Sequence, residues 1–336
     1  MDNPPAPSRP EPPPGRPYLP PPDIFVVPPR PGAYPLSRSG KERRLERMDQ
    51  YDRRAVLAGY ATLTPTGTVR LIFDIVDDFP FVYKPGYFVG IRSDIPGYGL
   101  RRSPYCIFSP PDGSRRFQLL VRLVPEGPVS CYLAALGVGE EVTFRGPSGR
   151  SMIPKESGTE LVMLATGVGI GPLLGLSQHL LPQGFDRPIH LYWGLRSTDD
   201  ISLLDELDGL RAAYPNFGYD ISLSQPPRDW AGLCGRLTET VPPLLPTLGD
   251  KHFYLVGNGA MIEEMDSALS DMGVDELMIH TETYFNVRHR ATPETVAAIR
   301  DRFVADDLFT PHAHYEAQGF MPERPVSPAR RKRTGS

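Results

Sequence analysis

Cysteine is scarce in this sequence of 336 residues: there are three, Cys106, Cys131 and Cys234, and no two of them form a CxxC pair. This excludes a four-cysteine iron–sulfur cluster built from this chain alone and favours a reducing compartment, so we expect a cytoplasmic protein. No apolar run approaches the roughly 20 residues that a membrane helix needs, and the first residues lack the apolar core of a signal peptide. We therefore expect neither a membrane partner nor secretion.

Strong net charge and metal-ligand spacing are missing as well. The formal net charge is −4, which gives no global field that would attract nucleic acid. Six of the seven histidines have no metal-ligand spacing, and the seventh, His280, falls in the last predicted strand, where a structural role is expected. The sequence thus predicts no nucleic-acid partner and no metal site.

Proline is in clear excess, with 40 residues in all and 15 of them in the first 35 positions. Such a segment favours extended polyproline II and buries no core, so residues 1–52 are predicted to be a disordered tail. Within the tail, PPDIFVVPP (21–29) carries four apolar residues. They either dock on an unknown partner or on the protein's own surface, or they are incidental in a linker.

Short runs rich in β-forming residues follow one another over residues 53–152. They are AVLAGYATL, VRLIFDIV, YFVGIRS, PYCIFS, RFQLLVRLV and EEVTFRG. Turn signals such as TPTG, KPG, PDGS and VGE separate them. Six short strands at close spacing predict a small antiparallel six-stranded β-barrel.

Over residues 153–285 the pattern changes to apolar strand candidates that alternate with helical patterns. The strand candidates are ELVMLAT, IHLYWGL, YDISLS, HFYLVG and ELMIHTETY, and the helical patterns lie at about 172–182, 200–213 and 258–272. This alternation predicts a doubly wound parallel sheet. Residues 286–336 form a C-terminal extension with one predicted helix, PETVAAIRDRF, and a basic end, ARRKRTGS.

A glycine-rich turn directly follows the first of these strands. Thr166, Gly167, Gly169 and Gly171 make the turn, and Pro172 suits the first position of a helix. Small residues leave backbone N–H groups clear for an anion at the helix N-terminus, and nucleotides bind at this edge of a doubly wound sheet. The pattern departs from GxGxxG, so the residues alone leave a phosphate cradle and a purely structural turn both open.

A barrel followed by a glycine–proline turn resembles the ferredoxin–NADP+ reductase superfamily, and most closely its bacterial ferredoxin (flavodoxin)–NADP+ reductases, over residues 55–285. Four motifs carry the resemblance: VPEGPVSCYLAAL, MLATGVGIGPLLG, YLVGNGAMI and IHTETYF. They are similar, in that order, to the family's flavin pyrophosphate segment, its nicotinamide-nucleotide loop, its CGNPxMI and its closing E-x-Y-aromatic. The resemblance implies an FAD-binding barrel over 53–152 and an NADP-binding domain over 153–285.

The family's flavin motif, R-x-Y-[ST], has a changed counterpart here. The aligned residues are Ser103, Pro104, Tyr105 and Cys106. Tyr105 matches the residue that packs on the isoalloxazine ring, with a core tyrosine as the alternative. Ser103 stands where the family's arginine neutralises flavin phosphate, so Arg101 and Arg102 are the candidates to reach the phosphate by a shifted loop. Cys106 replaces a hydroxyl next to flavin N5 and is a weaker donor, which predicts altered hydride transfer.

The resemblance also implies where the flavin pyrophosphate binds. The implied residues are Gly127, Pro128, Val129 and Ser130. A helix is expected to start next, at CYLAAL, which suits an anion. The alternative for Ser130 is an N-cap without a ligand.

On the nucleotide side, family members that prefer NADPH meet its 2′-phosphate with arginines. Arg196 and Arg236 stand at two of the expected positions, with plain surface residues as the alternative. The third arginine is absent, because the sequence reads Ser224, Gln225, Pro226, and Arg228 is the candidate to compensate. The implied nucleotide loops add Thr166, Gly167, Gly169, Pro172, Gly257 and Asn258. No acidic residue stands out for the ribose, although Asp199 and Asp200 follow the second strand.

At the far end, Glu282 and Tyr284 match the family's E-x-Y. The resemblance implies that Glu282 relays a proton or places the nicotinamide. It also implies that Tyr284 or Phe285 stacks on the flavin face that the nicotinamide occupies. With Tyr105 and Cys106, these residues complete the predicted catalytic set.

These motifs predict an FAD-containing reductase in which a hydride passes from NADPH to FAD and single electrons then leave. The acceptor is a separate protein, such as a ferredoxin, a flavodoxin or an oxygenase component, and Arg115 and Arg116 are candidates for its docking. An NADH-dependent reductase of a monooxygenase is one alternative. A non-catalytic flavin-binding interaction protein, whose two tails bind partners, is the other.

Overall fold

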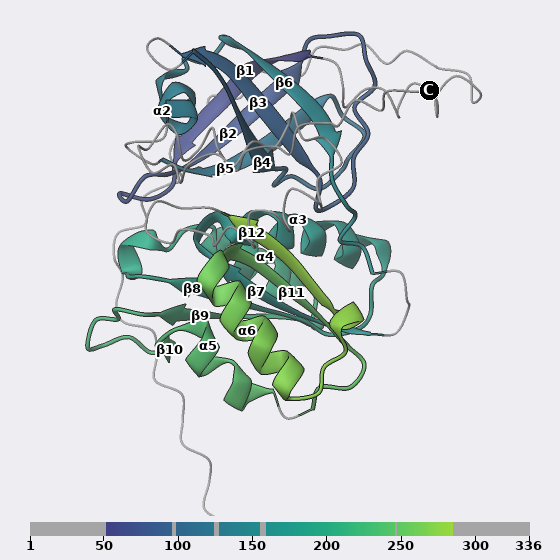
Figure 1. The fold of residues 1–336 in the computed structure, drawn as a ribbon, viewed down its shortest axis with the longest axis vertical. Helices are drawn as coiled ribbons and strands as arrows, with labels where there is room; N and C mark the ends of the chain where they lie inside the picture. Colours follow the sequence, from purple (N-terminus) through teal and green to yellow (C-terminus); the bar gives the residue numbers. More distant parts are fainter. Residues whose placement is uncertain (1–51, 96–98, 124–127, 155–158, 246, 285–336) are drawn as a thin grey trace, which may run out of the picture.

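The computed structural model describes residues 52–95, 99–123, 128–154, 159–245 and 247–284, which form two stacked lobes (Figure 1). We call residues 52–154 the barrel lobe and residues 159–284 the sheet lobe. Most of the predicted tail, the C-terminal extension, Gly127 and Phe285 lie outside the described residues. No helix within the described part of the chain has the length and apolar character needed to cross a membrane.

The barrel lobe is a six-stranded antiparallel sheet in the order β4-β3-β6-β1-β2-β5. Its elements are β1 Arg53–Thr62, β2 Thr68–Ile75, β3 Phe88–Ile95, β4 Gly99–Cys106, β5 Arg116–Arg122, α2 Pro128–Ala135 and β6 Glu141–Ser148. An isolated antiparallel bridge between Ile107 and Leu119 joins the end of β4 to β5 and closes the sheet on itself. The predicted barrel is confirmed, with β4 starting five residues and ending three residues earlier than the PYCIFS run indicated.

A buried arginine lies inside the barrel lobe. Arg53, the first residue of β1, is 1% exposed and forms an ion pair with Asp77 at 2.9 Å. Its side-chain N–H groups make five hydrogen bonds, to the Asp77 carboxylate and to the carbonyls of Phe79, Pro80 and Gly146. The rings of Phe81 and Phe144 lie 5.4 Å and 5.3 Å from the guanidinium carbon. The charge is thus fully paired, as a buried charge has to be.

The sheet lobe is a six-stranded parallel sheet in the order β10-β9-β8-β7-β11-β12, which confirms the predicted parallel sheet. Its strands are β7 Glu160–Thr166, β8 Ile189–Leu195, β9 Phe217–Leu223, β10 Leu233–Cys234, β11 Lys251–Asn258 and β12 Ile279–Tyr284. Its helices are α3 Ile170–Leu180, α4 Leu204–Ala213, α5 Leu237–Thr240 and α6 Gly259–Asp271. Short 3₁₀ turns are η2 Gly167–Gly169, η3 Leu181–Gln183, η4 Thr198–Asp200, η5 Pro242–Leu244 and η6 Glu276–Met278.

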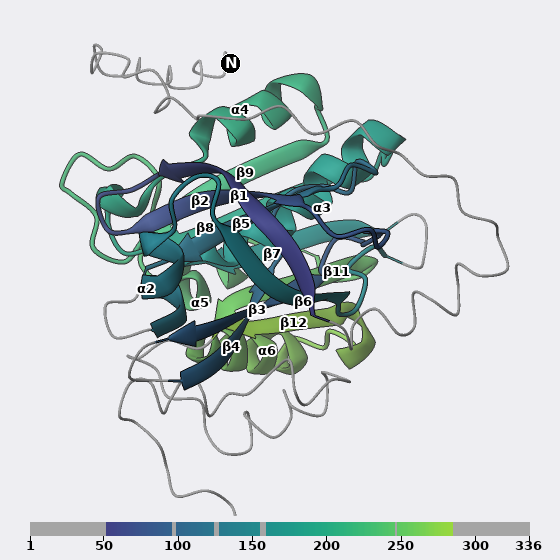
Figure 2. The same ribbon diagram turned by 90° about the horizontal axis from the view of Figure 1, so that it is seen from above.

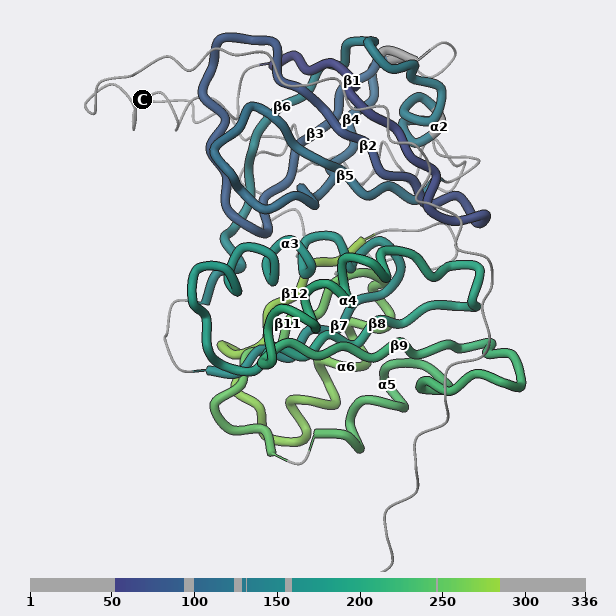
Figure 3. Tube along the Cα trace, turned by 180° about the vertical axis from the view of Figure 1, so that it is seen from behind, coloured from purple at the N-terminus to yellow at the C-terminus, as the bar shows by residue number. Residues whose placement is uncertain are grey.

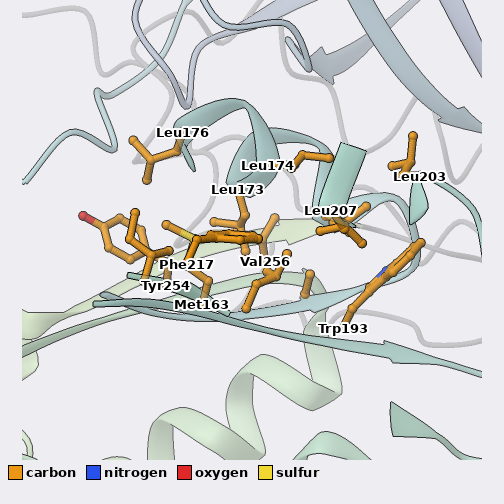
Figure 4. Packing of buried hydrophobic residues seen from close by; sticks show 14 of the residues in the cluster. Met163, Leu173, Leu174, Leu176, Trp193, Leu203, Leu207, Phe217, Tyr254 and Val256 are labelled. Carbon is orange, nitrogen blue, oxygen red and sulfur yellow. The ribbon is translucent and has the colours of Figure 1, made fainter. Parts of the chain in front are cut away.

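Helices cover both faces of the parallel sheet. α3 and α4 lie on the face toward the barrel lobe, and α5 and α6 lie on the opposite face (Figures 1 and 2). Leu173 and Leu174 of α3 pack with Met163, Trp193 and other strand residues in the core on the barrel side (Figure 4). The opposite core is formed mainly by the other side chains of β7 and β11 with α6. The alternation along each strand therefore supplies both cores.

Helix α3 also packs against the barrel lobe, and it lies between the two lobes in the view from behind (Figure 3). Gly171 faces Leu120 and Phe108, and a side chain on Gly175 would collide with the Phe108 carbonyl oxygen. These glycines let the helix approach the barrel lobe closely. Pro172 is the third residue of α3, so the prediction of the first helical position was wrong by two residues.

Candidate functional site

The predicted catalytic residues of the two lobes meet where β4 and β12 end. Cys106 ends β4 and Tyr284 ends β12, and their side chains lie close enough across the lobes for each to shift the pKa of the other. Glu282, two residues earlier on β12, is close enough for its charge to act on both side chains. The structure thus brings together residues that are about 180 positions apart in the sequence.

Both side chains of this contact are neutral. Burial raises the pKa of the Cys106 thiol well above its usual range, the Glu282 charge raises it further, and the bond from Tyr284 opposes this only in part. Burial likewise raises the pKa of Tyr284, with added contributions from Cys106 and Glu282. Because a thiolate is the nucleophilic form of cysteine, Cys106 is held as a thiol rather than activated.

Arginines gather on the strands that carry the predicted flavin motif. β3 and β4 pair in continuous register, with Arg92 opposite Arg102, so β4 contains no shifted loop at the motif. Because neighbouring strand residues point to opposite faces, Arg102 and Ser103 lie on different sides of the sheet. Burial lowers the pKa of Arg102, and the charges of Arg145 and Arg92 lower it further. An anion bound here would relieve this repulsion.

Two further observations bear on an anionic ligand at these strands. The Nε of Arg101 is buried and makes no hydrogen bond within the described residues. Arg92 and Arg145 both form an ion pair with one carboxylate, Asp52. Tyr105 is half-buried next to the barrel core. The donor set therefore fits a dinucleotide phosphate.

The predicted pyrophosphate segment forms helix α2, which contacts β3 and β4. The helix begins at Pro128 and not at Cys131, because proline is well suited to the first helical position. Ser130 is the third residue of this helix and therefore not the N-cap considered above. Val129 and Ser130 are both buried, with 4% and 7% of their surface exposed.

In the sheet lobe, the two predicted nucleotide loops are packed against one another. The Thr166 hydroxyl accepts a hydrogen bond from the backbone N–H of Asn258 at 2.7 Å. Gly257 has a φ of 131°, and a side chain there would collide with Thr166. A side chain on Gly169 would likewise collide with the Val256 carbonyl oxygen. These residues are required to join the ends of β7 and β11, whatever the loops bind.

Gly167 and Asn258 differ from these packed residues. Gly167 adopts a left-handed φ of 54°, is exposed and has nothing within 4 Å of the position of a side chain, while its carbonyl accepts from Trp193 at 2.9 Å. It is the glycine of the turn whose backbone a ligand can approach. Asn258 caps α6, because its side chain accepts from the N–H groups of Ala260 and Met261.

The predicted phosphate-binding residues line up at the carboxyl edge of the sheet. Leu195, Leu223 and Cys234 are register partners on β8, β9 and β10, so the residues that follow them lie side by side. Arg196 and Ser224 directly follow β8 and β9, whereas Arg236 stands two residues after the end of β10, and all three are exposed. The arrangement presents two guanidinium groups to solvent at the edge where nucleotides bind in such sheets.

Two residues at this edge, Gln225 and Asp200, make side-chain contacts that the sequence did not predict. Gln225, which stands where the third arginine is absent, accepts from the Nε of Arg196 at 3.0 Å. Asp200, considered above for a ribose, is instead bound by Thr66 and Arg122 of the barrel lobe. Its only sequence signal is the S-x-x-D capping pattern that begins at Ser197.

Histidines and acidic residues do not assemble into a metal centre among the described residues, where no three potential ligands gather. His280 lies between β11 residues: its Nε2 is 2.9 Å from Nδ1 of His252, and its ring stacks on that of Tyr254. Arg116, considered for acceptor docking, forms an ion pair with Asp74 and is mostly buried.

Known proteins match both lobes. A model of the oxidoreductase FAD-binding domain matches residues 67–153, and a model of the oxidoreductase NAD-binding domain matches residues 163–267. Ferredoxin–NADP reductase B of Sorangium cellulosum is 31% identical over 222 residues, which is 64% of this chain and 91% of that protein. The reductase component of the naphthalene 1,2-dioxygenase/salicylate 5-hydroxylase systems of Ralstonia is 30% identical, over 65% of this chain and 68% of that protein.

Solved structures show the same arrangement of two lobes. An Amycolatopsis cytochrome P450 reductase has a TM-score of 0.63 and 26% identity, over 70% of each chain. A ferredoxin NADP+ reductase from Neisseria gonorrhoeae, with bound FAD and NADP, has a TM-score of 0.59 and 22% identity, over 70% of this chain and 98% of that chain. The second likeness shows the fold alone.

Proposed function

Because the chain belongs to the ferredoxin–NADP+ reductase superfamily, and is an electron-transfer reductase that uses FAD and a nicotinamide nucleotide, we propose that it prefers NADPH and serves a ferredoxin or a flavodoxin. The FAD-binding domain is assigned to residues 53–152 and the NADP-binding domain to residues 153–285. The observation that carries the proposal is the meeting of Cys106, Glu282 and Tyr284 at the junction of the lobes.

The arginines and helix α2 are the residues that hold FAD in this proposal. Arg102, with Arg101 beside it, meets the phosphates, because a like-charged and partly buried guanidinium group gains most from an anion. Ser130 and the first turn of α2 add donors at a helix N-terminus. Tyr105 packs against the ring. When bound, the flavin accepts a hydride from the nicotinamide and passes electrons on singly.

The contact between Cys106 and Tyr284 excludes water from the place where the nicotinamide binds. Tyr284 occupies that place in the resting protein, so it has to move when the nucleotide enters. The Cys106 thiol stays protonated and presents a weak S–H donor. Glu282, whose charge acts on this thiol, is the group that accepts or returns a proton. Cys106 is expected to slow the hydride step relative to a serine.

The preference for NADPH rests on Arg196 and Arg236. Both are exposed at the carboxyl edge of the sheet, after β8 and β10, which flank β9. A 2′-phosphate is the group that separates NADPH from NADH. The Gln225 side chain accepts a hydrogen bond from Nε of Arg196, which leaves the two terminal nitrogen atoms of Arg196 available for a bidentate contact with phosphate. A single charged contact of this kind contributes roughly 1.5–3 kcal/mol.

The acceptor is proposed to be a ferredoxin or a flavodoxin because the Sorangium relative is named a ferredoxin–NADP reductase. An NADH-dependent reductase that serves an oxygenase is the second candidate, since the expected third arginine is missing and the Ralstonia relative is a reductase component of dioxygenase and hydroxylase systems.

Anaerobic stopped-flow mixing of the purified, FAD-loaded protein with each nicotinamide tests the proposal. We expect NADPH to bleach the visible flavin absorption faster, and at lower concentration, than NADH. Faster bleaching by NADH would favour the oxygenase reductase, and no bleaching by either nucleotide would favour a non-catalytic flavin-binding protein. Reduction of an added ferredoxin or flavodoxin then tests the acceptor.

A further inference from the structure

The turn that follows Arg196 is held by one carboxylate. In η4, the backbone N–H of Asp200 donates to the Ser197 carbonyl at 3.1 Å, and Asp200 Oδ2 accepts from the Ser197 N–H at 3.4 Å. Arg196 itself is tied to the end of β9, where its carbonyl accepts from the Gln225 N–H at 2.8 Å. Asp200 therefore contributes one backbone bond and one side-chain bond to the turn that follows Arg196.

The same carboxylate is bound by the barrel lobe. Asp200 Oδ1 accepts from the Thr66 hydroxyl at 2.7 Å and from Nη1 of Arg122 at 3.1 Å. Thr66 lies in the turn between β1 and β2, and Arg122 ends β5. Asp200 is only 14% exposed. Burial raises its pKa, but the bonds from Thr66, Arg122 and the Ser197 N–H, together with the charge of Arg122, lower it by more. The carboxylate is thus ionised at neutral pH, and both of its oxygen atoms accept hydrogen bonds.

We propose that Asp200 is a positioning residue through which the barrel lobe sets the place of Arg196 for the 2′-phosphate of NADPH. One oxygen of the carboxylate holds the turn next to Arg196, and the other holds the barrel lobe. Asp200 touches no ligand itself. The inference rests on the proposed role of Arg196, and it makes the nucleotide preference of the sheet lobe depend on Thr66 and Arg122 of the barrel lobe.

A second ion pair between the lobes provides a matched control. Arg70 of β2 pairs with Glu206 in the first turn of α4, and its guanidinium lies 5.1 Å from the Phe108 ring. Glu206 makes a similar contact across the lobes but is not bonded to the turn that follows Arg196. Glu206→Gln therefore reports what the loss of an interlobe charge pair does by itself.

The test is calorimetric titration of the FAD-loaded protein with NADP+ and, separately, with NAD+. Arg196→Ala is expected to raise the Kd for NADP+ roughly tenfold or more, as the loss of a charged contact does. Asp200→Ala is expected to raise it about three- to tenfold, with the Kd for NAD+ changed less than about twofold. In turnover, the KM for NADPH should rise while kcat stays close to that of the parent. Glu206→Gln should leave the ratio of the two Kd values unchanged.

Thr66→Val and Arg122→Ala keep the experiment decisive if Asp200→Ala folds poorly. Each should raise the Kd for NADP+ in part, and neither should add to the effect of Asp200→Ala, because all three act through one contact. A changed Kd ratio in Arg196→Ala with an unchanged ratio in the Asp200, Thr66 and Arg122 variants would overturn the inference and leave the proposed NADPH preference intact. An unchanged ratio in Arg196→Ala would overturn the role of Arg196 and the inference with it.

Discussion

Arg53 of the barrel lobe is buried, whereas Arg196 and Arg236 of the sheet lobe are exposed to solvent. Arg53 is buried, and its five hydrogen bonds go to the protein, chiefly to Asp77. Arg196 and Arg236 are exposed at the edge of the parallel sheet, and Arg196 makes one side-chain bond, to Gln225. A guanidinium whose donors are all used supports the fold, whereas one that keeps donors at a sheet edge is available to a ligand.

Removal of Arg53 should give the largest effect. Arg53→Ala leaves the Asp77 carboxylate buried without its partner, which should lower the free energy of unfolding by about 3–5 kcal/mol. The neighbouring Arg54→Ala is the control, because Arg54 and its partner Glu141 are both exposed, and it should cost at most about 1 kcal/mol. Urea unfolding followed by fluorescence measures both. Equal losses in the two variants would contradict the contrast drawn between buried and exposed arginines.

The Asp77 carboxylate should make the barrel lobe sensitive to acid. Burial raises the pKa of Asp77, but the hydrogen bonds and charge of Arg53 and the bonds from the N–H groups of Arg54 and Phe79 together lower it by a larger amount. The pKa in the folded protein therefore lies below its ordinary value. A lowered folded pKa stabilises the protein above the unfolded pKa of about 4, and that contribution is lost as the pH falls through the folded value. The difference in unfolding free energy between the parent and Asp77→Asn should therefore be constant from pH 7 to 5 and shrink below about pH 4. A constant difference down to pH 3 would argue against a paired carboxylate.

On the exposed side of the comparison, Arg236→Ala should weaken NADP+ binding about tenfold and leave NAD+ binding nearly unchanged, because one charged contact with the 2′-phosphate is lost. The thermal midpoint should stay within about one degree of the parent, since Arg236 is exposed. Calorimetric titration and a thermal scan measure the two quantities. Arg187, which is exposed and precedes β8 at the opposite edge of the sheet, provides the control. An effect of Arg187→Ala equal to that of Arg236→Ala would mean that the arginines act only as diffuse charge.

The smallest expected effect is at the junction of the lobes. Cys106→Ser should raise the rate constant of flavin reduction by NADPH by a few-fold, because a hydroxyl is a stronger donor than a thiol. Cys106 should also react with iodoacetamide far more slowly than the exposed Cys234, since burial raises the pKa of its thiol. Stopped-flow reduction and peptide mass mapping are the measurements. An unchanged reduction rate in Cys106→Ser would show that the thiol does not take part in the chemistry.

Elements with apolar runs were predicted well, and elements without them were not. β7 and β8 coincide with ELVMLAT and IHLYWGL, because buried parallel strands are apolar on both faces. β4 lies earlier than predicted because Arg101 and Arg102 interrupt its apolar pattern. The two-residue β10 and the four-residue α5 are too short to leave a periodic signal.

The candidate site shows the same division. Motifs alone predicted Cys106, Glu282 and Tyr284 as catalytic residues, and the structure brings these three predicted residues together. The bond between Thr66 and Asp200 joins residues 134 positions apart, and no local pattern can encode such a contact. Arg53 reads in the sequence like its exposed neighbour Arg54.

The amino-acid sequence by itself determined the order of barrel and parallel sheet, the nucleotide loops and the residue types at the site, because these depend on periodicity and short motifs. Only the tertiary structure decided which arginine is buried, which glycines serve packing and which aspartate joins the lobes. The physical reason is that burial and pairing arise from contacts between segments distant in the chain, and the same side chain has a different free energy in each surrounding.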